Sequence, residues 1–475
     1  MNIPTCPERP YLVAIALTSL LGVSLVGCNS NSGGGAKGGS GGASGQGTGG
    51  KVTSGGTTST SSASSSGGTT GQGGTSASGG STNTGGAPSS GGKTASSSST
   101  GTGGATGNGG TAAAGTAGGG STANVDAPVS DQYVVALVQS TKAQASDLTT
   151  SDVADMVSSA VSQAGGFDFI KDGQTVILKP NLVTAYTDGF MTKADMTVNG
   201  IATDWRVVKA VADLVRAKNP KGKILVMEGS TLPAATAFSI LGYTSANFGS
   251  SVDEFVAIEG ASCTDTSTGA LEQQTSRNGK QYWVNSRYFH ADVIISMPTM
   301  KTHLVAGISG SVKNLGIGTT PVGQFSSGTN TPTDCTRGQT PTAIDHTSPE
   351  TLGQFIRDYY SIRPADFAVM DGLQGLEHGP LPAWDRPPDG GMPYDYASSK
   401  KNMRLILAGR NAVAVDTIEA LVMKCDPKQV PHLTKLEADN LGTTDVSKIT
   451  VVGNKQVSDV ATPFAGAQTS ICPGI

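Results

Sequence analysis

The sequence predicts an α/β domain, with a mostly parallel sheet, helices on both faces and loop insertions, preceded by a long disordered tether. Between residues 133 and 452, short β-branched apolar runs alternate with helical patterns. The runs are apolar at successive positions, which is typical of parallel strands buried on both faces. Residues 29–125 consist almost entirely of Gly, Ser, Thr and Ala, and this composition buries too little apolar surface to fold.

Residues 1–27 are typical of an export signal. Arg9 precedes an uncharged apolar run that is short for a membrane span and ends just before Cys28. The segment LVGC at 25–28 resembles the bacterial lipobox, so we expect Cys28 to become the lipidated first residue of a membrane-anchored lipoprotein. Asn29 gives no inner-membrane retention signal, which favours the outer membrane in a cell with two membranes. The alternative is an ordinary signal with a chance cysteine.

Composition divides the rest of the chain into two parts. Residues 28–125 form a Gly/Ser/Thr-rich linker whose only charged side chains are Lys37, Lys51 and Lys93, and we expect it to be a flexible tether. Residues 126–475 form the domain, with 28 basic and 35 acidic side chains and a net charge of −7. Nucleic-acid binding depends on basic patches, so this balance argues against nucleic acid as a partner.

The elements of the domain follow from local patterns. A helix over Thr150–Gln163 has apolar residues at helical spacing and ends at a Gly-Gly pair. A second helix over Asp204–Lys218 is amphipathic and ends before a proline, and the last two helices are expected at Pro349–Tyr360 and Ala412–Lys424. Short β-branched or apolar runs predict strands at Tyr133–Gln139, Thr175–Leu178, Lys223–Met227, Ala291–Met297, Ala365–Met370, Met403–Leu407 and, at an edge, Ile449–Val452.

Polar clusters follow the predicted strands directly, at Lys179–Asn181, Glu228, Lys301–His303 and Asp371. The carboxyl ends of parallel strands meet at one edge of the sheet, where α/β proteins bind ligands. The sequence therefore predicts one composite site built from these clusters.

Residues 297–318 are the most informative stretch, and we expect a loop after a buried strand. Lys301 and His303 lie two residues apart and would share a face in an extended segment. A nearby ammonium keeps an imidazole neutral, as a base or metal ligand. Lys313 and Asn314, close to Gly310, Gly316 and Gly318, offer an ammonium, an amide and backbone N–H groups to an oxyanion. The alternatives are a solvated lysine in a glycine-rich turn and a hydrogen-bonded histidine.

Three carboxylates are candidates for the same site. Asp371 lies at a strand exit and Glu377 in a loop, where either would handle proton transfer or a metal together with His303. Asp416 lies at a helix start among apolar residues, and a buried carboxylate must be paired or neutralised. It pairs with a site lysine or serves a helix terminus.

A divalent metal is an alternative occupant of the site. His303, His346 and His378 would form a three-imidazole set gathered from separate loops, assisted by Asp371 or Glu377. The domain has no C-x-x-C spacing, which argues against an iron–sulfur cluster and a structural zinc. Three disulfide pairings remain open for the four cysteines of the domain, Cys263, Cys335, Cys425 and Cys472.

Seven segments occur in an order that resembles the bacterial and archaeal domain-of-unknown-function family 362 over about residues 170–425. The resemblance implies an α/β domain without an agreed activity. Some family members carry ferredoxin-type cysteine motifs that imply a redox role, but this chain has none and carries Pro- and Gly-rich insertions at about 320–345 and 381–397. The segments are ILKPNLV (177–183), VMEGS (226–230), MPTMKTH (297–303), VKNLGIG (312–318), His346, VMDGLQGLEHGP (369–380) and AVAVDTIEAL (412–421).

The sequence thus predicts an exported lipoprotein that binds or acts on a small phosphate- or carboxylate-bearing molecule. We expect the catalytic groups to be His303, Lys301, Asp371 and Glu377. We expect the ligand contacts to be Lys179, Asn181, Glu228, Lys313, Asn314 and Asp416. The alternatives are a non-catalytic surface binding protein and a metal-centred redox protein, and the class of reaction is not readable from the sequence.

Overall fold

The computed structural model describes residues 133–183, 196–229, 233–259, 261–321, 344–385, 391–466 and 468–473. The signal and tether expected at 1–27 and 28–125, with Cys28, and also Cys335, lie outside these residues. All described residues belong to one compact unit, Thr111–Ile475. Among them, no helix has the length and apolar character needed to cross a membrane.

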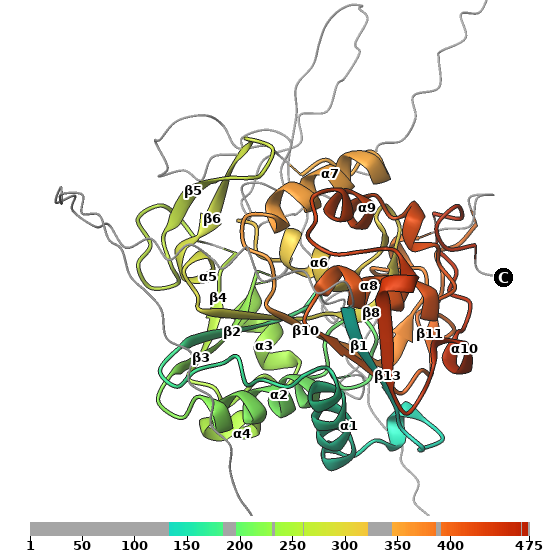
Figure 1. The fold of residues 1–475 in the computed structure, drawn as a ribbon, viewed down its shortest axis with the longest axis horizontal. Helices are drawn as coiled ribbons and strands as arrows, with labels where there is room; N and C mark the ends of the chain where they lie inside the picture. Colours follow the sequence, from blue (N-terminus) through green and yellow to red (C-terminus); the bar gives the residue numbers. More distant parts are fainter. Residues whose placement is uncertain are drawn as a thin grey trace, which may run out of the picture. The chain divides into compact units, whose positions relative to one another are not determined.

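A mixed sheet forms the centre of the domain (Figure 1). Its strands lie in the order β13-β1-β12-β10-β7-β2-β3-β4. Along this path only β12 runs antiparallel to its neighbours, so the predicted mostly parallel sheet is confirmed. The strands are β1 (Tyr133–Gln139), β2 (Thr175–Pro180), β3 (Lys223–Glu228), β4 (Glu254–Ala257), β7 (Val293–Met297), β10 (Phe367–Leu376), β12 (Leu405–Gly409) and β13 (Ile449–Gly453).

Helices cover both faces of this sheet, as predicted (Figure 1). In β1, Val135 and Leu137 belong to one buried core and Ala136 and Val138 to the other, because successive side chains point to opposite faces. One face carries α1 (Thr150–Gln163), α2 (Trp205–Lys218), α3 (Ala234–Ile240) and α4 (Ser245–Phe248). The other face carries α6 (Gly310–Gly316), α7 (Pro349–Tyr360), α8 (Ala412–Val422) and α9 (Pro431–Ala438).

Side-chain caps explain where the principal helices begin. Thr149 and Asp152 form a capping box on α1, Asp204 accepts a hydrogen bond from the backbone of Arg206 at the start of α2, and Ser348 caps α7. The predicted bounds of α1 and α7 are confirmed. The remaining elements are β5 (Leu271–Thr275), β6 (Gln281–Asn285), α5 (Ser286–Phe289), β8 (Thr299–His303), β9 (Gly307–Ile308), β11 (Lys400–Lys401), α10 (Val457–Val460) and short 3-10 turns.

The order of the strands defines where a ligand would lie. From β2 the chain continues outward through β3 and β4, and it then returns to place β7 on the opposite side of β2. Open α/β sheets bind ligands at such a switch point, beyond the carboxyl ends of the strands. At this point Pro180 of β2 is in register with Met297 of β7.

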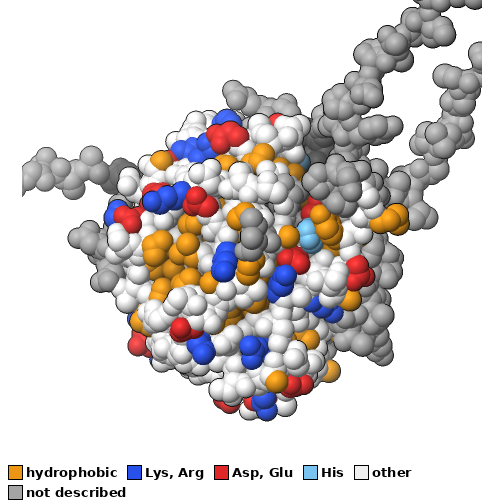
Figure 2. Space-filling model, turned by 90° about the vertical axis from the view of Figure 1, so that its right-hand side faces the viewer, with side chains coloured by type: hydrophobic (Ala, Val, Ile, Leu, Met, Phe, Trp, Pro, Cys, Tyr) orange, Lys and Arg blue, Asp and Glu red, His pale blue; other side chains and the backbone are white. Residues whose placement is uncertain are grey.

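The surface has a mixed character on the face shown in Figure 2. Basic and acidic side chains are interspersed there, together with hydrophobic areas. The large hydrophobic side chains that are exposed in the described part of the chain are Val134, Met392 and Val446.

Candidate functional site

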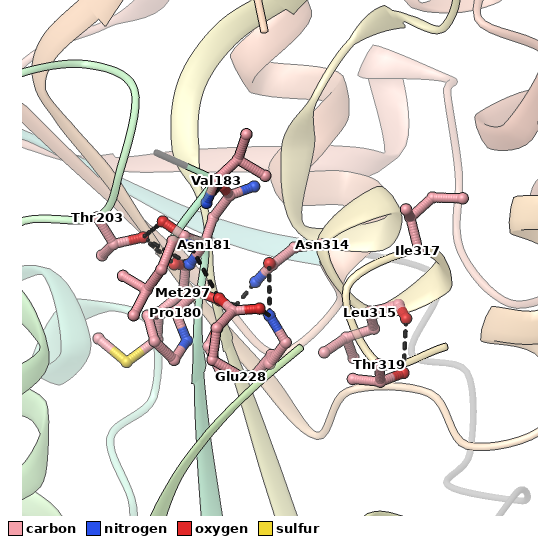
Figure 3. A network of polar contacts seen from close by, with 12 residues as sticks. Pro180, Asn181, Val183, Thr203, Glu228, Met297, Asn314, Leu315, Ile317 and Thr319 are labelled. Carbon is pink, nitrogen blue, oxygen red and sulfur yellow. Dashed lines mark hydrogen bonds and ion pairs between the residues drawn. The ribbon is translucent and has the colours of Figure 1, made fainter. Parts of the chain in front are cut away.

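A buried ion pair closes the carboxyl ends of β2 and β3. The Lys179 ammonium lies 2.8 Å from Oε1 of Glu228, and it donates to the Pro180 carbonyl at 2.6 Å and to Oδ1 of Asn314 at 3.3 Å. Oε2 of Glu228 accepts from the Leu182 backbone at 2.8 Å. Burial lowers the pKa of Lys179 and raises that of Glu228, while their pairing opposes both shifts. Three predicted site residues therefore meet in one network (Figure 3).

Asn181 links this network to the neighbouring strand (Figure 3). Its backbone exchanges hydrogen bonds with Thr203, at 2.9 and 2.8 Å, and the Thr203 hydroxyl donates to the Met297 carbonyl at 2.7 Å. Oδ1 of Asn181 accepts from the Lys301 ammonium at 3.3 Å, and this ammonium also donates to the Ile201 carbonyl. Asn181 thus joins the Lys179 network to Lys301.

The segment expected to be a loop at Lys301–His303 is instead the buried strand β8. It pairs with β10, which continues past its predicted end at Met370 as far as Leu376, and with β9. The prediction was wrong because this pairing stabilises an extended conformation that local polarity disfavours. Burial, and then the charge of Lys313, lowers the pKa of Lys301 to about 7.

His303 is held as a neutral imidazole. Its Nδ1 accepts hydrogen bonds from the backbone N–H groups of Val305 and Ala306, both at 3.1 Å, so the ring proton is on Nε2. Burial, and then the nearby charge of Lys313, holds the pKa of His303 well below its usual value. A neutral imidazole with a fixed tautomer can donate a hydrogen bond from Nε2 to a bound oxygen.

Lys313 is the central charge of the site. The loop expected around Lys313 is instead the helix α6, and the side chain is half-buried. Within the described residues, the ammonium has no hydrogen bond or ion pair. Burial, and then Lys179, lowers the pKa of Lys313 to about 8. Burial and Lys313 in turn lower the pKa of His346 to about 4 and that of His432 to about 3.

Asp416 holds α6 in place. Its carboxylate accepts from the Ser311 N–H at 2.6 Å and from the Val312 N–H at 2.8 Å. Gly310, with φ of 59°, lies so close that a Cβ there would be 2.5 Å from Oδ2 of Asp416. Burial raises the pKa of Asp416 to about 7, although both N–H bonds oppose the shift. Asp416 thus serves a helix terminus, which was one of its two predicted roles.

Two buried groups near these lysines were missed by sequence reasoning. Glu419, one turn after Asp416 in α8, is fully buried near the Lys301 backbone, and within the described residues neither carboxyl oxygen has a well-aligned hydrogen bond. Burial, and then the charge of Asp416, raises the pKa of Glu419 well above its usual value. His432 is fully buried, and neither of its ring nitrogens has a hydrogen-bond partner within the described part of the chain. The only sequence signal for Glu419 was a charged residue in an apolar helix.

The other predicted carboxylates are engaged away from His303. Asp371 accepts from the backbone N–H of Asp204 at 2.7 Å and of Leu373 at 3.0 Å, and Asp204 pairs with Arg206 at 2.7 Å. Burial, and then Asp204, raises the pKa of Asp371 to about 7. Glu377 pairs with Lys401 at 2.9 Å and accepts from the Ala465 N–H at 2.9 Å. Both carboxylates therefore already have structural partners.

Comparison with known proteins identifies the family. The family model described as "Domain of unknown function (DUF362)" matches residues 176–420, more than half of the chain. The chain belongs to the DUF362 family. No curated protein sequence shows significant similarity to it.

A solved structure also resembles the DUF362 chain. It is the lactate racemase apoprotein from Thermoanaerobacterium thermosaccharolyticum, with 13% sequence identity and a TM-score of 0.31. The match covers 58% of this chain and 54% of that one, so the chain spans about half the length of that protein. A likeness at this level carries no argument about function.

The structure does not assemble the expected three-imidazole metal set of the DUF362 domain. Within the described ranges, no three His, Cys, Asp or Glu side chains are grouped to hold a metal ion. Nδ1 of His303 accepts from two backbone N–H groups, which leaves a proton and no lone pair on its Nε2. His346 is left without its two expected partners.

The structure also identifies one disulfide among the alternatives left open. Cys425, just beyond α8, is bonded to Cys472 near the end of the described chain. Cys263 is disulfide-bonded as well.

Proposed function

We propose that the DUF362 domain binds a small carboxylate- or phosphate-bearing molecule at Lys313 and Lys301 and transfers a proton on it. The observation that carries this proposal is the half-buried Lys313 ammonium, which has no partner in the described part of the chain. Burying a cation without a counter-charge is costly. An anion at this position supplies the missing charge.

The histidines around Lys313 add no positive charge to the proposed anion site. The pKa values of His303, His346 and His432 are all lowered, so these rings stay neutral at pH 7 and add no competing charge. The Nε2–H of His303 provides a neutral donor. A bound anion favours the protonated forms of Lys301 and Lys313, whose pKa values are about 7 and 8 without it.

Proton transfer is proposed because the pKa of Lys301 lies near neutrality. Lys301 has a pKa of about 7 without a ligand, and because a bound anion raises this pKa, Lys301 is protonated in the complex and serves as a general acid. Perturbed pKa values gathered at strand carboxyl ends are typical of active sites. We assign Lys179 a structural role in the site, because its ammonium already donates hydrogen bonds to Glu228, Asn314 and the Pro180 carbonyl.

Titration calorimetry with succinate and with inorganic phosphate tests the binding. We expect Lys313→Met to weaken the binding of at least one anion more than tenfold, and Lys313→Arg to retain most of it. Lys428→Met removes an exposed lysine from the 3-10 turn Pro427–Gln429 and serves as the matched control. Equal affinities of wild type and Lys313→Met for both anions would overturn the proposal.

Export and lipid anchoring are part of the same proposal. They rest on the signal and lipobox in residues 1–28, and the Cys425–Cys472 disulfide is compatible with an oxidising compartment. We expect radiolabelled palmitate to be incorporated into the wild-type chain and not into Cys28→Ser. Equal labelling of both chains, or labelling of neither, would refute the anchor.

A further inference from the structure

A second polar cluster lies beside β8 and has no role in the function proposed above. His378 follows the end of β10 by two residues, and its Nδ1 lies 3.0 Å from Oδ2 of Asp385. The ring of Tyr394 stacks on the imidazole, with the centroids 3.4 Å apart and the planes 10° apart. The His378 side chain keeps 12% of its surface exposed, so it remains open to a small molecule.

The backbone holds His378 in a conformation that side chains rarely adopt. Its φ is 57°, in the left-handed region, and such strain persists only where the surroundings enforce it. The His378 N–H donates to the Ala465 carbonyl at 3.0 Å. The next residue, Gly379, accepts from the Leu304 N–H at 2.8 Å and donates to the Thr302 hydroxyl at 3.1 Å. These bonds fix the His378 backbone alongside the end of β8.

The same geometry places the cluster near Lys301. Lys301 is in register with Leu376, two residues before His378. The Lys301 ammonium donates to the carbonyl of Ile201, and the hydroxyl of Tyr396, two residues after Tyr394, donates to the carbonyl of Asn199 at 2.9 Å. The loop at 199–201 therefore contacts both Lys301 and the segment that stacks on His378.

The hydrogen bonds give the two imidazoles beside β8 opposite tautomers. His378 donates from Nδ1 to the Asp385 carboxylate, so its Nε2 carries a lone pair. His303 accepts at Nδ1, so its Nε2 carries the proton. Within the described part of the chain, neither Nε2 has a hydrogen-bond partner. One ring is thus prepared to accept a proton and the other to donate a hydrogen bond.

We propose that His378 and Asp385 form a proton-accepting dyad of the anion site, and that the ligand is a small anion carrying a hydroxyl or amino group. This proposal rests on the proposed function. Lys313 and Lys301 hold the anionic group, and Nε2 of His378 takes the proton from the ligand's O–H or N–H. The electron pair of the broken bond stays on the ligand oxygen or nitrogen. The new imidazolium is stabilised by the Asp385 carboxylate, which also orients the ring.

Nitrogen-15 NMR of the histidine side chains in the full-length protein tests the dyad, with His378→Gln for assignment. Malate and succinate are the probes, because they differ by one hydroxyl. We expect His378 to be protonated on Nδ1 in wild type and its Nε2 resonance to move with malate and much less with succinate. Both movements should be lost in Lys313→Met. Asp385→Asn should redistribute the tautomers of His378 and remove the preference for malate.

A matched control is the exposed pair of His290 and Glu272, which are 2.9 Å apart. The His290 resonances should not respond to either anion. A proton on Nε2 of His378 in wild type would overturn the dyad. The dyad would also be overturned if malate moved the His303 resonances in a Lys313-dependent way and left the His378 resonances unchanged. This second result would leave the proposed function intact. If neither malate nor succinate produces a Lys313-dependent change, the dyad proposal fails. The proposed function fails with it only when phosphate also binds wild type and Lys313→Met with equal affinity.

Discussion

The ammonium of Lys179 lies 2.8 Å from the carboxylate of Glu228, and both side chains are buried where β2 and β3 end. The pair fixes the chain as it leaves the sheet, because Glu228 also accepts a hydrogen bond from the Leu182 N–H and Lys179 donates one to the Pro180 carbonyl. This lysine is therefore a structural support. Lys301 and Lys313, which have no carboxylate partner among the described residues, remain for a ligand.

Breaking the pair on one side should be costly. Glu228→Gln leaves Lys179 buried without its counter-charge, and we expect the free energy of unfolding to fall by about 3–5 kcal/mol. The double replacement Lys179→Met with Glu228→Leu should recover much of this loss, because it removes both buried charges. Urea denaturation at pH 7 measures the effect. Unchanged stability of Glu228→Gln would show that the pair does not support the fold.

The affinity for an anion should depend on pH. The pKa values of Lys301 and Lys313 are about 7 and 8 in the free protein, and an anion raises both, so binding takes up protons between the free and bound values. Affinity should be highest below about pH 7 and fall as the pH rises through 7 and 8. Calorimetry with succinate between pH 6 and pH 9, in buffers of different ionisation enthalpy, measures affinity and proton uptake. A pH-independent affinity would contradict the prediction.

Helix α6 should depend on the absence of a side chain at Gly310. Alanine there has two costs, the left-handed φ of 59° and a Cβ 2.5 Å from Asp416. Gly279→Ala is the control, because Gly279 has φ of 76° with nothing within 4 Å of a Cβ. We expect Gly279→Ala to cost about 1–2 kcal/mol of stability and Gly310→Ala clearly more. Only Gly310→Ala should weaken succinate binding, and equal effects in both assays would refute the clash.

The sequence predicted those parts of the molecule that local patterns determine. The bounds of β1, α1 and α7 are confirmed because caps, breakers and apolar periodicity lie within each segment. The strand β8 was missed because its pairing partner in β10 is about 70 residues away and local polarity favoured a loop.

The same distinction applies to the candidate site. The polar residues that follow β2, β3 and β7 do gather at one edge of the sheet, as strand order requires. The sequence could not show that Lys179 is already paired. Its partner Glu228 is 49 residues away, and only the fold brings the two side chains together. Glu419 gave no signal beyond its place in an apolar helix.

A metal should be absent from the purified protein in stoichiometric amount. Nδ1 of His303 accepts two backbone N–H bonds, so its Nε2 carries the proton and offers no lone pair to a metal. Within the described ranges, no three His, Cys, Asp or Glu side chains are grouped to hold one. Elemental analysis of protein purified without added metal, together with native mass spectrometry, measures the content. A stoichiometric metal lost in His303→Ala would contradict this prediction and restore the three-imidazole set.

The C-terminal segment should support the site through the disulfide between Cys425 and Cys472. Ile471 packs so closely on Gly307 of β9 that a Cβ on this glycine would lie 2.6 Å from the isoleucine side chain. The Gln468 amide donates to the Leu304 carbonyl at 2.8 Å. These contacts hold the turn between β8 and β9, which supplies the two N–H groups that fix His303.

Removing the disulfide should therefore affect both stability and binding. We expect Cys425→Ser with Cys472→Ser to lower the free energy of unfolding by about 2–4 kcal/mol. We also expect weaker succinate binding and a mixture of His303 tautomers, because the tail no longer holds the β8–β9 turn. Gln468→Ala separates the two effects, since it removes a tail contact and leaves the disulfide in place. Gln468→Ala should weaken succinate binding with a smaller loss of stability. If the double serine variant bound succinate with full affinity, the C-terminal segment would stabilise the fold without supporting the site.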